Sequence, residues 1–107
     1  MLYKFLFFAL VILAVALEVV ADIIFKKWAS ANKASLFYMG LVIYMAGTIF
    51  WAVSLKYEFL SKAISVFAIL NIVILVLAGV IIFKEDLSFV NKIGIALGIL
   101  SVILIEL

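Results

Sequence analysis

The sequence contains no cysteine, no histidine and no arginine among its 107 residues. The absence of cysteine excludes disulfide bonds and thiolate metal sites. Without histidine as well, the usual ligands of a transition metal are missing, so we expect no metal and no cofactor. Any proton chemistry must therefore use carboxyl groups. With no nucleophile–base pair and no metal cluster in the pattern, we expect no enzyme activity.

Charge is also scarce. Eight lysines and six acidic residues give a net charge of +2, and these residues are dispersed along the chain. Nucleic-acid binding needs a basic face or stripe, so we expect no nucleic-acid partner.

Apolar residues are abundant in contrast, at 72% of the chain. Soluble domains are about 45–50% apolar, and small ones bury only about 60–65% of their unfolded surface. A soluble fold of this size could not hide so many apolar side chains. The sequence therefore predicts a multi-pass protein of the cell (inner) membrane, with the lipid bilayer as its main surroundings.

Four apolar segments, separated by the charge clusters, have roughly the length of 20 residues that a membrane-spanning helix needs. They cover about residues 5–25, 35–55, 63–83 and 87–107. Each must be helical, because lipid leaves unpaired backbone groups unsatisfied and four strands cannot close a barrel. We predict an all-α membrane protein with four short transmembrane helices per subunit, dimeric, in a single domain over residues 1–107.

The N-terminus superficially fits a signal peptide, with Lys4, an apolar run and small residues at 14–16. However, the apolar run continues to Phe25, so we expect the segment to be retained. Three lysines on one side of the membrane against five on the other place the N-terminus outside. So small a bias also permits insertion in both orientations.

An acidic pair lies in the first segment. Glu18 is about three residues from the segment centre, roughly 4–5 Å from the membrane midplane. A charge at such a depth costs about 2.5–3.5 kcal/mol. Asp22 follows one turn later on the same helix face, so both must face the bundle interior or a wet cavity. A coupled carboxyl pair of this kind can hold either protons or a cationic substrate.

Asp22 has a second interpretation, because Lys26 follows four residues later and could neutralise it near the interface. Glu18 has no lysine three or four residues away. Glu18 is therefore the stronger candidate for a proton and substrate site.

Other polar and aromatic residues are possible substrate contacts. Asn71 and Ser65 lie in the third segment, and Tyr44 and Trp51 lie in the second. Asn71 could equally form an interhelical hydrogen bond, and the aromatic rings could belong to the core or the interface.

Glycines mark close helix approach. Gly94 and Gly98 form a GxxxG spacing in the fourth segment, which predicts a dimer contact. Gly40 and Gly47 share one face of the second segment and predict tight packing, within the bundle or around a cavity.

These features resemble the small multidrug resistance transporters of the drug/metabolite transporter superfamily. The run Ala16–Ala21, with Glu18 before two valines and with Lys26 eight residues on, is similar to that family's first-helix signature. The run Ile82–Ser88 resembles its third loop, and Gly94 and Gly98 resemble the small residues of its fourth helix. The resemblance implies an antiparallel homodimer in which two copies of Glu18 bind protons or a small organic cation in exchange.

The third segment departs from the family. Its start, Leu60–Ala68, lacks the Pro-x-Gly pattern and the Tyr and Trp of the drug exporters, and Asp22 replaces a residue that is usually neutral. Ser61–Ala63 and Leu70–Asn71 look more like the aminoarabinose-lipid flippase subunits.

Three functions therefore stay open. The first is a proton-coupled exporter of small organic cations. The second is a flippase subunit for a sugar linked to polyprenyl phosphate, in which Lys62 and Asn71 would matter. The third is a non-transporting membrane interaction protein that uses its fourth segment.

Overall fold

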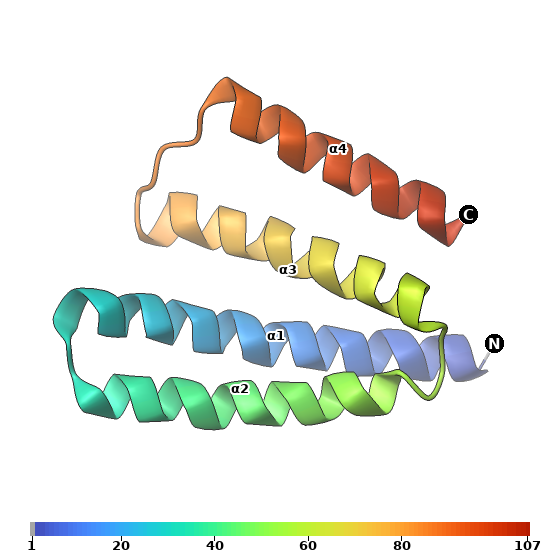
Figure 1. Ribbon diagram of the computed structural model, residues 1–107, viewed down its shortest axis with the longest axis horizontal. Coiled ribbons are helices and arrows are strands. Elements are labelled where there is room, and N and C mark those ends of the chain that lie inside the picture. Colours follow the sequence, from blue (N-terminus) through green and yellow to red (C-terminus); the bar gives the residue numbers. More distant parts are fainter. Residues whose placement is uncertain (1) are drawn as a thin grey trace. The chain divides into compact units, whose positions relative to one another are not determined.

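The computed structural model describes residues 2–107, which form four α-helices in chain order (Figure 1). They are α1 (Leu2–Ala31), α2 (Ala34–Ser54), α3 (Leu60–Ile82) and α4 (Phe89–Glu106). Each is long and apolar enough to cross a membrane, and the described residues contain no strand. The predicted all-α membrane fold is confirmed.

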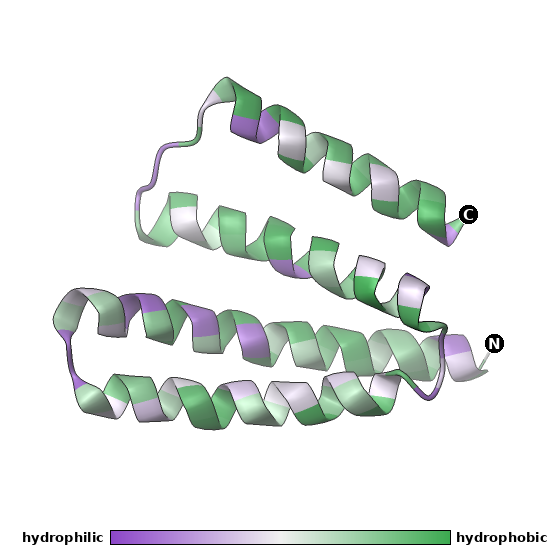
Figure 2. Cartoon of the chain, in the orientation of Figure 1, coloured by the Kyte–Doolittle hydropathy of each residue, from purple (hydrophilic) through white to green (hydrophobic). Residues whose placement is uncertain are grey.

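α1 contains 30 residues and is therefore longer than the segment 5–25 that its apolar run predicts. Lys26 and Lys27 end the apolar run without ending the helix, because lysine is a good helix former. Figure 2 shows hydrophilic residues on this part of α1. At about 1.5 Å per residue the helix measures about 45 Å and exceeds the hydrocarbon core of about 30 Å. It ends where Asn32 takes a φ of 57° and its N–H donates to the Trp28 carbonyl at 2.7 Å.

The starts of α3 and α4 also differ from the expected ones. α3 begins at Leu60 instead of residue 63. α4 begins at Phe89 instead of residue 87, because the Ser88 hydroxyl accepts a hydrogen bond from the Asn91 N–H at 3.1 Å and caps the helix. With 18 residues, α4 is the shortest of the four helices.

At the end of α3, one backbone carbonyl accepts two hydrogen bonds. The Gly79 carbonyl accepts hydrogen bonds from the N–H groups of Phe83 and Glu85, at 3.2 and 3.1 Å. Lys84 lies between these two residues with a φ of 53°, in the left-handed region that favours glycine. A side chain in this conformation costs roughly 1–2 kcal/mol.

We expect Lys84→Gly to stabilise the protein by up to about 1 kcal/mol, because glycine adopts the left-handed conformation without the Cβ contact. Lys84→Ala is the control, since alanine loses the lysine charge but keeps the Cβ. Thermal unfolding in detergent compares them. A glycine variant no more stable than the alanine variant would contradict the expectation.

The chain divides into two compact units. α1 and α2 form the first, and α3 and α4 form the second. The single four-helix domain over residues 1–107 stays a prediction, and each unit is described by itself.

α1 and α2 pack antiparallel along what we call the α1–α2 seam. The buried residues of α2 are the small residues Gly40, Gly47 and Ser54, seven positions apart. A Cβ on Gly40 would lie 2.7 Å from Phe25 Cε1, and one on Gly47 would lie 2.9 Å from Glu18 Cγ. Seven residues forward along α2 thus match seven residues back along α1, which fixes the register of the two helices. The α1 side contains the buried residues Phe7, Val11, Ala14, Glu18 and Ala21.

In the second unit, α4 approaches α3 at Gly98, where an added Cβ would lie 3.0 Å from Ile69 Cδ1. Beside this contact the two helices leave an open cavity of about 250 Å³. All of its lining residues are aliphatic: Ile69, Leu70, Val73, Ile99, Val102 and Ile103.

Candidate functional site

Glu18 is buried in the α1–α2 seam, with 5% of its surface exposed. Its Cγ faces Gly47 on α2, where only a glycine leaves room for the side chain. The Tyr44 hydroxyl, on the same face of α2, is a hydrogen-bond partner of the carboxylate. The second carboxylate oxygen, Oε2, is buried and has no hydrogen-bond partner within residues 2–107. A buried acceptor without a partner is costly, so this oxygen has capacity for a ligand or a proton.

Asp22 lies one turn along α1 from Glu18 and is half-buried. Four residues separate it from Glu18, so both acids share one face of α1, the face beside Tyr44 of α2. We call Glu18, Asp22 and Tyr44 the acidic site. The predicted acidic pair is therefore brought together with one of the predicted aromatic contacts.

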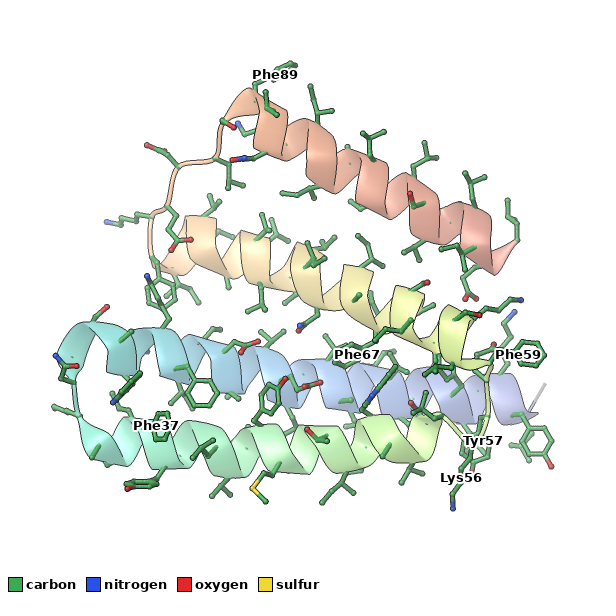
Figure 3. The ribbon with its side chains drawn as sticks, in the orientation of Figure 1. Phe37, Lys56, Tyr57, Phe59, Phe67 and Phe89 are labelled. Atoms are coloured by element: carbon green, nitrogen blue, oxygen red, sulfur yellow. The ribbon has the colours of Figure 1, made fainter. Side chains whose placement is uncertain are left out.

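Aromatic rings extend from the acidic site toward the connection between α1 and α2. The ring of Phe25 lies 6.4 Å from that of Tyr44 and 5.9 Å from that of Phe37, and Trp28 lies 5.0 Å from Phe37. Figure 3 shows Phe37 near the start of α2. These centroid distances are within the usual range for aromatic pairs, about 4.5–7 Å. The contacts of Phe37 and Trp28 were not predicted from the sequence, because they depend on the register of the seam.

Trp51 lies on the same face of α2 as Tyr44 but two turns further along, and is half-buried. Its carbonyl accepts a hydrogen bond from the buried Ser54 hydroxyl at 2.6 Å. Two helical turns correspond to about 11 Å, which separates Trp51 from the acidic site. A substrate contact at Trp51 stays a prediction.

Ser65 and Asn71 belong to α3, in the second unit. The Ser65 hydroxyl donates to the Ser61 carbonyl at 2.7 Å, which satisfies it within its own helix. Asn71 Oδ1 is buried without a hydrogen-bond partner in the described part of the chain. The interhelical hydrogen bond suggested by the sequence is thus not made through this oxygen. Both residues stay predicted substrate contacts.

Gly94 and Gly98 have different surroundings, although the sequence groups them in one motif. Gly98 packs against Ile69 of α3, whereas a Cβ on Gly94 would meet no atom of the described residues within 4 Å. Within the second unit, Gly98 therefore lies against α3. The predicted dimer contact at Gly94 and Gly98 stays a prediction.

The family model of the Small Multidrug Resistance protein matches residues 5–98, which include the acidic site and most of all four helices. The chain belongs to the small multidrug resistance family. Neither the curated proteins nor the solved structures give a significant individual match. The small multidrug resistance family consists of multi-pass membrane transporters. Membership therefore implies a transport function and a location in the membrane, which in bacteria is the inner membrane. The match also favours transport of drug-like compounds over the flippase and the interaction-protein alternatives.

Proposed function

We propose that this small multidrug resistance protein is a proton-coupled exporter of small organic cations, with Glu18 as the shared proton and substrate site. One observation carries the proposal: Glu18 is buried in a membrane-spanning helix and keeps one carboxylate oxygen without a hydrogen-bond partner among residues 2–107. A bare charge within the membrane costs about 2.5–3.5 kcal/mol. Binding a proton or binding a cation removes that cost.

The two ways of neutralising Glu18 exclude each other, and this exclusion couples them. A proton that arrives from one side displaces the cation, and a cation from the other side displaces the proton. The Tyr44 ring supports cation binding, since an aromatic face attracts a cation within about 6 Å. The Tyr44 hydroxyl holds the carboxylate in place from α2.

Alternating access requires a cavity that opens to one side at a time. We propose an antiparallel homodimer in which two copies of Glu18 face such a cavity. The small lysine bias, three against five, supports insertion in both orientations. The open surface at Gly94 supports a contact between α4 helices.

Proton release tests this proposal directly. Adding tetraethylammonium to purified protein in weakly buffered detergent should acidify the solution near neutral pH. The release should vanish at alkaline pH, where the carboxyl groups are already ionised. Glu106→Gln, at the end of α4, is the control and should release protons like the unmodified protein. Tetraethylammonium binding without proton release at any pH would contradict the coupling.

A further inference from the structure

Two aromatic pairs mark the ends of the α1–α2 helix pair. At one end the rings of Tyr3 and Tyr57 stack with centroids 5.8 Å apart, and at the other end the centroids of Trp28 and Phe37 are 5.0 Å apart. Figure 3 shows Phe37 and Tyr57 at opposite ends of this helix pair. Tyrosine and tryptophan are enriched where the hydrocarbon meets the lipid headgroups. The two aromatic pairs therefore indicate where this helix pair leaves the hydrocarbon.

Lysines occur at the same two levels of α1. Lys4 directly follows Tyr3, and Lys26 and Lys27 directly precede Trp28. Lys4 and Lys26 are 22 residues apart on one helix, which corresponds to about 33 Å at about 1.5 Å per residue. The hydrocarbon core is about 30 Å thick. Both lysine levels therefore reach the headgroups, on opposite sides of the membrane.

The two ends differ in charge. Three exposed lysines form what we call the basic end, at the connection between α1 and α2: Lys26, Lys27 and Lys33. No acidic residue occurs in the sequence between Asp22 and Glu58. At the opposite end, Lys4 and Lys56 are accompanied by Glu58, two residues after Lys56. The positive charge of this helix pair is therefore concentrated at the basic end.

A cluster of like charges at headgroup depth needs negative partners, because the lysines repel one another. Each lysine close to a membrane surface strengthens the binding of anionic lipids by about fivefold. The contact between Trp28 and Phe37 favours a lipid over a soluble anion, because it holds the lysines at the level of the lipid phosphates. The same positive charges repel small organic cations, so the basic end is distinct from the acidic site.

We propose that the basic end binds the headgroups of anionic phospholipids, with Lys27 and Lys33 donating to the phosphate oxygens. The proposal does not depend on the exported compound, and no transport step is needed to test it. In the proposed antiparallel dimer, the two basic ends lie at opposite membrane surfaces. Each leaflet then supplies anionic lipid to one subunit.

Lipid binding to the purified protein tests the charge preference. The protein in neutral detergent is titrated with phosphatidylglycerol or with phosphatidylcholine of the same acyl chains, and bound lipids are counted by native mass spectrometry. Phosphatidylglycerol should bind roughly tenfold or more tightly, as two lysines at about fivefold each imply. The preference should shrink as salt is added, because salt screens exposed charges. Equal affinities for the two lipids at low salt would overturn the proposal.

Two double variants locate the binding. Lys27→Gln combined with Lys33→Gln should reduce the preference for phosphatidylglycerol to roughly threefold or less. Lys4→Gln combined with Lys56→Gln removes the same charge at the opposite end and should leave the preference nearly unchanged. All four side chains are exposed, so both variants should keep the helical content of the unmodified protein. Equal losses in the two variants would show a response to net charge alone and would overturn the proposal.

Tryptophan fluorescence locates the lipid without any lysine variant. Trp51→Phe leaves Trp28 as the single tryptophan of the chain. Phosphatidylglycerol brominated near the top of its acyl chains should quench Trp28 at a lower concentration than phosphatidylcholine brominated at the same position. Unbrominated phosphatidylglycerol should prevent the quenching. If inorganic phosphate at the same concentration prevented it equally well, the basic end would be a site for a soluble anion, and the lipid proposal would be wrong.

Discussion

Glu18→Gln is expected to reduce cation export to the background rate of protein-free liposomes. Glutamine cannot carry the negative charge that a proton or a cation neutralises, so both halves of the exchange are lost together. The fold should persist, because the Cγ that packs against Gly47 is present in both side chains. Export is measured in proteoliposomes with an imposed pH gradient, and the helical content and melting temperature are measured in detergent.

Two matched variants sharpen this result. Glu106→Gln removes a carboxyl group at the C-terminal end of α4 and should leave export unchanged. Glu18→Asp keeps the charge and should retain measurable, weaker export, because the shorter side chain withdraws the carboxylate from Tyr44. Substantial export by Glu18→Gln would show that the shared site lies elsewhere.

Gly47→Ala is expected to impair both stability and export. The new Cβ would lie 2.9 Å from Glu18 Cγ, 3.2 Å from the Ala14 carbonyl oxygen and 3.2 Å from Leu17 Cβ. Two of these atoms belong to or adjoin the α1 backbone, so α2 itself must move away. Overpacking of this kind costs about 1–3 kcal/mol. The movement also separates the Tyr44 hydroxyl from Glu18, so export should decline even where the protein remains folded.

Gly40→Ala is the control for this variant, on the same helix and the same face. Its Cβ would meet the Phe25 ring, the end of a side chain that can rotate away. The loss of thermal stability should therefore be smaller than for Gly47→Ala. Equal melting temperatures and equal export for the two variants would show that the backbone contact at Gly47 does not set the position of α2.

The sequence alone was sufficient to predict the four helices, because a helix formed by each apolar run has nearly the length needed to cross the bilayer. It was not sufficient for their ends. The predicted end of α1 at residue 25 followed hydropathy, whereas the helix continues to Ala31 because Lys26 and Lys27 favour helix. Hydropathy describes where a chain leaves the lipid, and backbone capping decides where a helix ends.

Glu18 could be identified from the sequence because a charge within a membrane costs free energy. That argument does not require knowing which residues surround it. The surroundings of Glu18 required the register between α1 and α2. A signal for that register was present, in Gly40, Gly47 and Ser54 at intervals of seven. No matching pattern on another helix accompanies the spacing of Gly94 and Gly98. Only the structure shows that the two glycines have different surroundings.

The α1–α2 seam has a consequence for the evolution of substrate range in this protein. Positions 40, 47 and 54 are buried and hold small residues, so we expect larger residues there to disturb the helix pair whatever the substrate. Tyr44 is 40% exposed and lies on the acidic site without filling the seam. A change at Tyr44 can therefore alter the shape and charge preference of the site while the helix pair stays intact. Saturation libraries aimed at new substrates should vary this position first.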